Sequence, residues 1–554
     1  MRQYIILSLL LSLCRIQGFG QEPATALHER VYLQTDKQLY LSGEIVWIKA
    51  LTVTPERTPL SFSKLVYVEL LNETTSLQQV KIGLSDGAGE GWMRVPLDLP
   101  SGYYRLVGYT RLMRNEGPDV FFETVIGVVN TFRPVSSGAQ AVTPTDALAL
   151  IADRAEKSNT ITLSLNKQSF TIREAGQLQL DGLPDDVHTL SVSIAGKQPI
   201  PVPGSGGIMQ WYEQVKPAKE PLSGKYIPEY EGHIVTGKIV ALDGFSQPGT
   251  DINAFLCVPG EHPYLFTGKR NGDDVSFYLT DMTGVTEIVT TTAGSSDNYR
   301  IEIQSPFIRQ HIDRQLPYLP IDSTHLDELL KRSIALQLLP NPVRDTLAGP
   351  VTRNTYNIPE PSKTYKLDEY TRFPKMDELI IEFVLGVRFR MRDGKREIIM
   401  AVIRGNEIPW ITPLVLFDGI PIKNHELIYQ YNPHIVEKID LYMKEYVFGG
   451  IKYDGVISFS TYTHSYPELI LDNTYQIIDY AGTQPKYNPV YTDRKRQPDF
   501  RHTLLWNPFL QTAGESSLQI PFYTSDYTGD FVITIEGLTK TGKPVYATLS
   551  FMVE

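Results

Sequence analysis

Cysteine is scarce in this sequence, and long apolar runs are missing beyond its first residues. The 554 residues include two cysteines, Cys14 and Cys257. Cys14 lies in an N-terminal stretch that we expect to be removed, so the mature chain would keep Cys257 alone and form no internal disulfide. After that stretch, no segment reaches about 18 unbroken apolar residues, and we therefore predict no transmembrane helix.

Positive charge is also in deficit. Lysine and arginine together number 52, against 63 aspartate and glutamate residues, which gives a formal net charge of −11. Sequence-independent binding of nucleic acid needs a basic surface, so this balance argues against it. The 42% of hydrophobic residues and 21% of charged residues are ordinary for a globular protein, and the length is enough for several domains.

The sequence motifs of common enzymes are missing as well. None of the ten histidines has a second one four residues away, and neither a His-Glu-x-x-His motif nor a Gly-x-Ser-x-Gly elbow occurs. We therefore predict no catalytic, cofactor-binding or metal-binding residue, and no enzyme. The histidines are expected to be ordinary surface or loop residues. An enzyme with an unrecognised site is kept as an alternative.

The N-terminus has the features of a secretory signal peptide. Met1–Gln3 is a short basic start, Tyr4–Leu13 is an apolar run too short to span a bilayer, and Gly18–Gly20 offers small residues for cleavage. We predict a signal peptide over residues 1–20, and hence export. Lipidation at Cys14 is a second interpretation that the sequence leaves open, because the preceding Leu13 is larger than a lipidation motif prefers.

Alternating apolar and polar residues predict β-strands in the first part of the mature chain. One strand is expected at Val31–Thr35, a turn at Leu41–Gly43, and a second strand at Glu44–Lys49. Together with Asp36-Lys37, Tyr40 and the Pro100-Ser-Gly-Tyr-Tyr segment, this pattern resembles the second type of macroglobulin domain (MG2) of alpha-2-macroglobulin-like proteins. The resemblance implies a seven-stranded antiparallel sandwich over residues 28–133. A generic Ig-like sandwich would have the same architecture.

That resemblance does not extend to a protease trap. Traps of the macroglobulin family carry a reactive thioester in a Cys-Gly-Glu-Gln sequence, which this chain lacks. Cys257 lies in the apolar, strand-like Phe255–Pro259 instead, and we expect it to be a buried structural thiol.

The middle of the chain predicts further β domains. Residues 148–200 show alternating runs typical of a second β sandwich, and residues 201–231 resemble a loop or linker that carries Trp211 and Tyr212. Val235–Val240, with Gly249 and Phe277 downstream, resembles a carboxypeptidase regulatory-like domain, which would occupy residues 232–307. A helical connector is expected over 308–364, with an amphipathic helix that begins near Asp322 and ends before Pro340.

A small α+β domain is expected over residues 365–464. Asp377–Leu385 predicts a helix, Pro413–Ile422 predicts a strand, an Asp-Gly turn and a returning strand, and Gly455–Ser460 predicts a last strand. The order resembles the plug domain of TonB-dependent outer-membrane transporters. A transporter barrel needs at least about 200 residues, whereas about 90 follow this domain, so we expect no barrel in this chain. Those last residues, 465–554, predict a C-terminal β sandwich.

The sequence therefore predicts a mainly β protein with tandem Ig/macroglobulin-like antiparallel sandwiches and one small α+β plug-like domain. We expect an exported, non-catalytic scaffold or accessory subunit of an outer-membrane complex in a Gram-negative envelope, peripheral to the membrane. Its partner would be a β-barrel or a barrel-associated protein. A surface module that binds glycans or peptides for nutrient uptake is an alternative. The candidate partner-binding residues are Asp418, Gly419, Gly449, Gly450, Trp211 and Tyr212. Membrane face, ligand and oligomeric state stay open.

Overall fold

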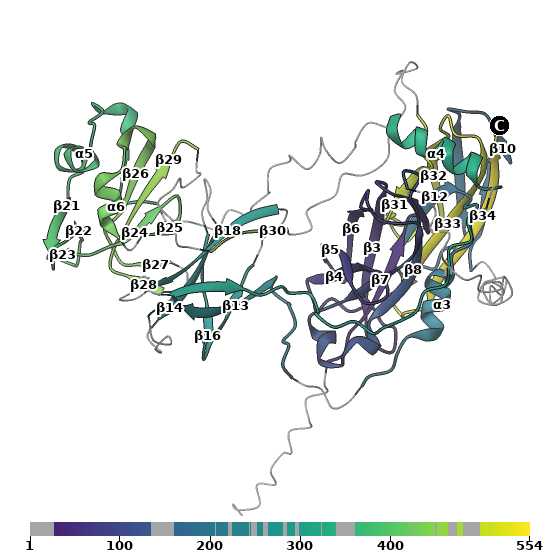
Figure 1. Ribbon diagram of the computed structural model, residues 1–554, viewed down its shortest axis with the longest axis horizontal. Helices are drawn as coiled ribbons and strands as arrows, with labels where there is room; N and C mark the ends of the chain where they lie inside the picture. Colours follow the sequence, from purple (N-terminus) through teal and green to yellow (C-terminus); the bar gives the residue numbers. More distant parts are fainter. Residues whose placement is uncertain are drawn as a thin grey trace, which may run out of the picture.

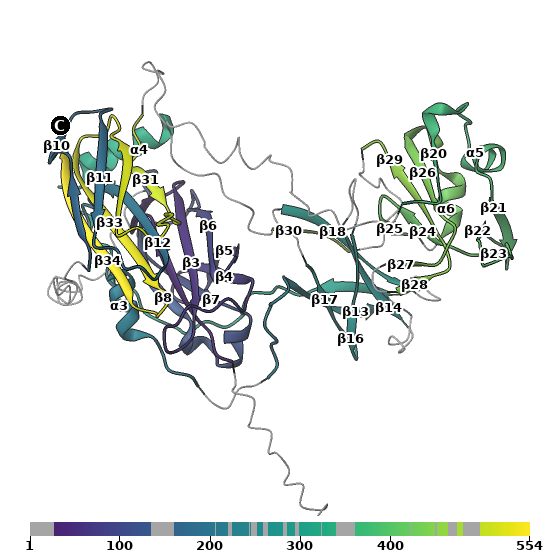
Figure 2. The same ribbon diagram turned by 180° about the vertical axis from the view of Figure 1, so that it is seen from behind.

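The computed structural model describes residues 27–133, 160–338, 360–463, 474–479 and 499–554, apart from short gaps at 205, 220–223, 243, 245–251, 259–263, 281–284, 294–298, 323, 423 and 449–450. The predicted signal peptide with Cys14, and the start of the predicted second sandwich at 148–159, lie outside these residues. Figures 1 and 2 show two lobes, one with two packed sandwiches and the other with a third β domain and the α+β domain.

The first sandwich follows the predicted strands. Its sheets have the orders β1-β3-β6 and β2-β8-β7-β4-β5. It has eight strands where the resemblance implied seven, because the three-residue β2 pairs in parallel with β8. The strands are β1 Arg30–Thr35, β2 Leu39–Leu41, β3 Ile45–Val53, β4 Leu65–Leu71, β5 Ser76–Gly83, β6 Ala88–Arg94, β7 Gly102–Tyr109 and β8 Phe122–Val129.

The second sandwich corrects the predicted domain boundaries. The regions 148–200 and 465–554 were expected to form separate sandwiches, yet their strands share one pair of sheets, β10-β34-β33-β12-β31 and β32-β11-β9. The central strand β12 lies between β33 and β31, which come from the other end of the chain. Neither region has enough strands to bury its own apolar face, so they close one core together. The strands are β9 Thr162–Leu165, β10 Ser169–Phe170, β11 Ala175–Asp181, β12 Val187–Gly196, β31 Thr503–Asn507, β32 Ser517–Tyr523, β33 Gly529–Thr539 and β34 Pro544–Val553.

Two helices pack on the sandwich lobe. The loop predicted over 201–231 contains the helix α3 (Gly207–Gln214), whose buried Ile208 joins the core of the first sandwich. The expected amphipathic helix is present as α4 (Leu326–Leu338), with buried Leu329 on the side that faces the sandwiches. The periodicity of residues 207–214 spans barely two turns, too few for a confident helical signal against the surrounding Gly and Pro residues.

The third β domain has two four-stranded sheets, β16-β17-β13-β19 and β15-β14-β18-β30. Its edge strand β30 pairs antiparallel with β18. This strand lies in the region 465–554 that was expected to form the C-terminal sandwich, so the prediction is wrong there too. The strands are β13 Ile234–Ala241, β14 Asn253–Val258, β15 Tyr264–Thr267, β16 Lys269–Asn271, β17 Asp274–Tyr278, β18 Val285–Ala293, β19 Tyr299–Ile303 and β30 Thr474–Asp479.

The α+β domain contains the elements predicted for it. A five-stranded sheet, β20-β26-β29-β24-β25, and a three-stranded sheet, β21-β22-β23, enclose a core with the helices α5 and α6. The elements are β20 Lys363–Lys366, α5 Met376–Phe383, β21 Val387–Arg392, β22 Lys395–Ala401, β23 Trp410–Ile411, β24 Leu414–Phe417, β25 Ile420–Pro421, α6 His425–Gln430, β26 Val436–Tyr442, β27 Tyr446–Phe448, β28 Ile451–Tyr453 and β29 Val456–Thr461. In the described part of the chain, no helix combines the length and apolar character needed to cross a membrane.

Candidate functional site

The predicted Asp418–Gly419 turn is present, but it faces the neighbouring domain. Asp418 has a φ of 47°, is 2% exposed, and accepts 2.7 Å hydrogen bonds from the backbone N and the Oγ1 of Thr461. The next residue but one, Ile420, is buried in a cluster with Cys257 and other apolar residues of the third β domain. The turn therefore positions Ile420 for contact between two domains of this chain. The Asp418 carboxylate stabilises the turn through its hydrogen bonds to Thr461.

Trp211 and Tyr212 hold α3 on the first sandwich. The Trp211 ring lies 4.9 Å from the Tyr32 ring. The Tyr212 carbonyl accepts a 2.7 Å hydrogen bond from Arg57 Nε, and the Arg57 guanidinium lies 4.5 Å from the centre of the Tyr212 ring. Both predicted contact residues are thus engaged in packing, while Gly449 and Gly450 lie outside the described residues.

Cys257 is buried, as predicted, and burial raises the pKa of its thiol. The expectation for the histidines is wrong at several positions, because His233, His425 and His502 are buried. Burial lowers the pKa of each of these imidazoles, so they stay neutral as packed rings. Within the described ranges, no three His, Cys, Asp or Glu side chains gather in a way that could hold a metal ion.

A buried ion pair fixes α4 to the sandwiches. Arg332 donates from Nε to Glu44 Oε1 at 2.9 Å and from Nη2 to Glu44 Oε2 at 2.7 Å, and its Nη2 also donates to the Leu39 carbonyl at 2.8 Å. Burial alone would raise the pKa of Glu44, but Arg332 and Lys37 outweigh it and hold that pKa below its ordinary value. Glu44 is therefore a carboxylate, and the pair is charged.

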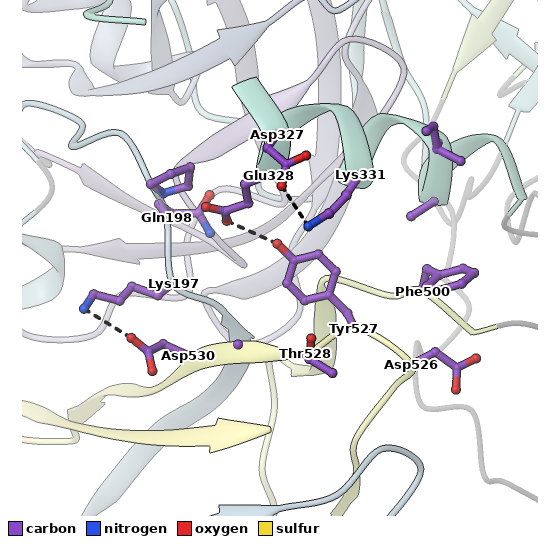
Figure 3. A pocket seen from close by; sticks show the side chains of 14 residues that line it. Lys197, Gln198, Asp327, Glu328, Lys331, Phe500, Asp526, Tyr527, Thr528 and Asp530 are labelled. Atoms are coloured by element: carbon purple, nitrogen blue, oxygen red, sulfur yellow. Dashed lines mark hydrogen bonds and ion pairs between the residues drawn. The ribbon is translucent and has the colours of Figure 1, made fainter. Parts of the chain in front are cut away.

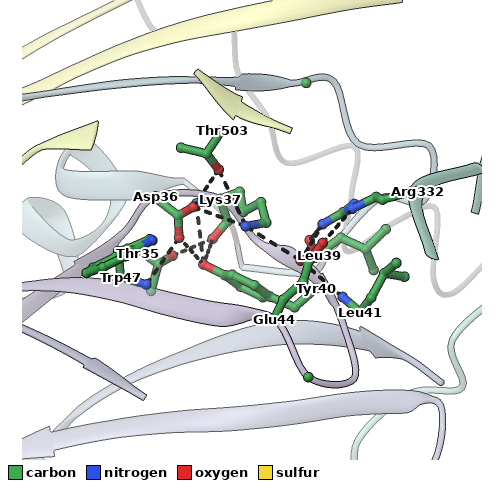
Figure 4. Close-up of polar contacts among 12 residues, drawn as sticks. Thr35, Asp36, Lys37, Leu39, Tyr40, Leu41, Glu44, Trp47, Arg332 and Thr503 are labelled. Carbon is green, nitrogen blue, oxygen red and sulfur yellow. Dashed lines mark hydrogen bonds and ion pairs between the residues drawn. The ribbon is translucent and has the colours of Figure 1, made fainter. Parts of the chain in front are cut away.

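A chain of polar contacts continues from this pair into the second sandwich (Figure 4). Lys37 Nζ lies 3.6 Å from Glu44 Oε2 and 3.1 Å from Asp36 Oδ2. Asp36 accepts hydrogen bonds from Tyr40 Oη at 2.8 Å and from Thr503 Oγ1 at 2.7 Å. We call this set, Asp36, Lys37, Tyr40, Glu44, Arg332 and Thr503, the junction network. It connects the first sandwich, α4 and the second sandwich.

The contact between the two sandwiches, which we call the seam, combines apolar packing of Leu538 with further polar contacts. Tyr32 Oη donates to Glu536 Oε2 at 2.5 Å, and Ser191 Oγ donates to Gln34 Oε1 at 2.5 Å. Lys49 is 1% exposed in the same region, and burial lowers the pKa of its ammonium to about 7, partly opposed by the Glu536 charge. Alternation predicted Tyr32 and Gln34 on one face of a strand, without the partner sheet that covers them.

A cavity of about 680 Å³ opens beside the junction network (Figure 3). Its walls come from α4, from residues 197–199 and from residues 500–530. Tyr527 Oη donates to Glu328 Oε1 at 3.1 Å, and burial together with Glu328 raises the pKa of the Tyr527 hydroxyl, which stays protonated. The lining residues are Lys197, Gln198, Pro199, Asp327, Glu328, Lys331, Ile334, Ala335, Phe500, Asp526, Tyr527, Thr528, Gly529 and Asp530.

The chemistry of this cavity suits non-covalent binding. Two aromatic side chains, Phe500 and Tyr527, adjoin exposed charges of both signs, such as the Lys331–Asp327 pair at 2.8 Å. Rings offer stacking faces, and the charged and amide groups offer hydrogen bonds to a polar ligand. This site was not predicted, because its walls come from three segments that alternation and motif searches treat separately.

Comparisons with known proteins give no family. Neither models of protein families nor curated proteins match the sequence. Among solved structures, Salmonella alpha-2-macroglobulin reacted with methylamine matches with 9% identity, a TM-score of 0.25, and coverage of 95% of this chain and 39% of that one. The native conformation of alpha-2-macroglobulin from Escherichia coli matches with 9% identity, a TM-score of 0.24, and coverage of 96% and 40%. The trypsin-activated Escherichia coli protein matches with 8% identity, a TM-score of 0.23, and coverage of 95% and 41%.

This chain therefore spans about two fifths of the length of these structures. At such TM-scores the likeness does not establish a shared fold. The macroglobulin resemblance stays a sequence-based prediction, and so do the carboxypeptidase regulatory-like and plug-like resemblances.

Proposed function

We propose that the protein is an exported, non-catalytic scaffold or accessory subunit of an outer-membrane complex. Its partner is a β-barrel or a barrel-associated protein. The observation that carries the proposal is the junction network, which joins α4 and both sandwiches by charged contacts buried from solvent. Such contacts fix a mutual orientation, because the hydrogen-bond geometry of a buried charge is satisfied in one arrangement only. A scaffold needs this fixed geometry more than it needs reactive groups.

The lobe that contains the third β domain and the α+β domain, which we call the far lobe, supports the same function. Ile420 holds the α+β domain against the third β domain through an apolar contact. The α+β domain also carries Ile381, Leu385, Ile408 and Val447, each of which is more than 60% exposed. Where such side chains form a contiguous patch, they mark a contact surface for another molecule.

Crosslinking on intact cells tests the proposal. A tagged full-length chain, recovered from gently solubilised envelopes, should bring an outer-membrane β-barrel with it. Arg332→Leu should lower that recovery by loosening α4, whereas the exposed neighbour Lys331→Leu should leave it unchanged. A chain that is recovered alone, or equal recovery for both variants, would contradict the proposal.

A second candidate function, binding of a soluble glycan or peptide, is favoured by the cavity beside α4. The expected ligand would stack on Tyr527 or Phe500, and stacking of this kind contributes about 0.5–1.5 kcal/mol per ring. Calorimetric titration with oligosaccharides and short peptides should show binding that Tyr527→Ala and Phe500→Ala weaken. Trp211→Ala should not weaken it, because Trp211 packs between α3 and Tyr32. Binding that Trp211→Ala abolishes and Tyr527→Ala spares would rule out this cavity.

A further inference from the structure

The sheet β21-β22-β23 has one covered face and one open face. Alternation assigns Val387, Ile398 and Met400 to the covered face, where they belong to the core of the α+β domain. The residues between them therefore lie on the opposite face, where Ile399 is buried and its cross-strand partner Arg388 is exposed. The outward residues include Arg388 and Glu397, and the register confirms their common side, because Arg390 pairs with Glu397 at 3.2 Å across the strands.

The open face is strongly basic. Arg388, Arg390, Arg392 and Lys395 all lie on it and are exposed, and Glu397 is the carboxylate among them. Arg390 and Arg392 share that carboxylate at 3.2 and 3.9 Å, and Arg392 also lies 3.8 Å from Asp393 in the adjoining turn, so four cations face two carboxylates. This local excess stands in a chain with a net charge of −11. Such a reversal of sign points to an anionic partner.

One end of the same face is apolar. Ile408 is 66% exposed, Ile403 is 46% exposed and Trp410 is 42% exposed. They flank a tight hairpin closed by the Arg404–Glu407 bridge, and Gly405 supports its turn with a φ of 58°. The Arg388 guanidinium lies 4.1 Å from the centre of the Trp410 ring and joins the apolar end to the basic stripe.

The position of this face leaves it open to a large flat object. Figures 1 and 2 both place β21, β22 and β23 at one extreme of the long axis, away from the sandwich lobe. The apolar side chains are exposed on and beside one hairpin, which suits shallow insertion into a fluid surface. Tryptophan prefers the boundary between headgroups and acyl chains, and guanidinium groups bind phosphate oxygens in pairs.

We propose that this face, defined by Arg388, Arg390, Arg392, Lys395, Ile403, Ile408 and Trp410 and called the tip face, is a membrane-surface site. It binds the phosphate groups of anionic lipid headgroups, while Ile408 and Trp410 enter the boundary layer. This proposal goes beyond the scaffold function and does not need a barrel partner. It gives the chain a second point of attachment at the envelope.

Vesicle flotation with the purified full-length chain tests the tip face. Vesicles that contain phosphatidylglycerol should bind the chain, pure phosphatidylcholine vesicles should bind it weakly, and added salt should weaken the binding to the anionic vesicles. Arg388→Glu combined with Lys395→Glu should lower the partition by about tenfold or more, since each basic residue near an anionic surface contributes to binding. Ile408→Ser should lower it by a smaller factor.

Matched controls come from the other lobe. Leu97 is 65% exposed on the first sandwich, so Leu97→Ser matches Ile408→Ser in exposure, and Lys219→Glu reverses a cation whose side chain is 53% exposed. Both controls should bind anionic vesicles like the unmodified chain, and circular dichroism should confirm that all variants are folded.

Equal binding to neutral and anionic vesicles, or no binding, would overturn the proposal. So would tip-face variants that lose an envelope protein in crosslinking while keeping their vesicle binding, because the face would then dock a protein. An unmodified chain that is recovered without a barrel partner and still binds anionic vesicles would count against the scaffold function alone.

Discussion

Lys331 and Arg332 are neighbours on α4 that carry the same charge in opposite surroundings. The Arg332 side chain is 3% exposed and donates to both oxygens of Glu44, whereas Lys331 is 71% exposed and pairs with Asp327 in solvent. A buried charge that loses its partner keeps its desolvation cost, while water screens an exposed pair. The attachment of α4 therefore depends on Arg332 rather than on Lys331.

Glu44→Gln should destabilise the sandwich lobe because it leaves the Arg332 guanidinium buried without a counter-charge. The free energy of unfolding should fall by about 3–5 kcal/mol. The exposed change Asp327→Asn should cost less than about 1 kcal/mol. Urea unfolding measures both variants. Equal losses for the two would show that the junction network does not hold α4.

Lys49 should make stability depend on pH. Burial lowers the pKa of its ammonium from 10.5 to about 7, so between these values the unfolded chain binds more protons than the folded chain. Stability from this group therefore rises as the pH increases above 7 and is lowest below it. Lys49→Met lacks this contribution, so the unmodified chain should gain stability relative to the variant between pH 7 and 9. Parallel pH curves of unfolding free energy would show that Lys49 does not titrate in the seam.

The strands were predictable one at a time, but their partners were not. The alternation of Thr189–Ile194 predicted β12, and the apolar positions of Asp530–Glu536 predicted β33. Alternation every second residue shows which residues of a strand share a face. It does not identify the neighbouring strand with which that strand pairs. Pairing β12 with β33 joins segments that are more than 300 residues apart, and this long-range contact merged two expected domains into one.

The candidate site could likewise be predicted in its local elements but not in their contacts. The Asp418–Gly419 turn follows from its dipeptide, because both residues tolerate positive φ. Its role does not follow from it, since the burial of Ile420 depends on a sheet more than 120 residues earlier in the chain. The cavity beside α4 left no local signal, because each of its three walls has ordinary residues for its own element.

Ile420→Asp should detach the α+β domain from the third β domain. The new carboxyl group would be buried against Cys257 and Phe255 without a partner, at a cost of about 1–3 kcal/mol, which raises the open population by about fivefold to a hundredfold. Cys257 reports the opening, because its thiol is fully buried. Its reaction rate with a thiol reagent should rise in the mature form, and the exposed change Ile408→Asp should leave the rate unchanged. An unaltered rate for Ile420→Asp would show that this contact does not hold the domains together.

The far lobe lies between two halves of one sandwich in the sequence. The chain leaves the second sandwich after β12, builds the third β domain, returns to the sandwich lobe at α4, builds the α+β domain, adds β30 to the third β domain, and re-enters the second sandwich at β31. Both lobes are visible in Figure 1. The far lobe is thus inserted into a host sandwich as two segments, one before and one after α4.

Deletion of residues 499–554 should unfold the second sandwich and spare the α+β domain. The deletion removes β31–β34, so β12 loses both neighbours, β11 keeps only β9, and the core they share is lost. Hydrogen exchange of the full-length and shortened chains should show lost protection in β11 and β12, with β24 and β29 still protected. Retained protection in β12 would mean that its own half of the sandwich is stable alone.

The interleaved sandwich also has a consequence for biogenesis. Translation and translocation proceed from the N-terminus, so β12 emerges roughly 300 residues before β31 and β33. Both edges of β12 stay unpaired until those strands emerge. Unpaired strand edges attract other unpaired edges during such a delay. A cell that secretes this chain would therefore need a holdase to shield the nascent half-sheet, and the demand for that chaperone should rise with every residue added to the intervening lobe.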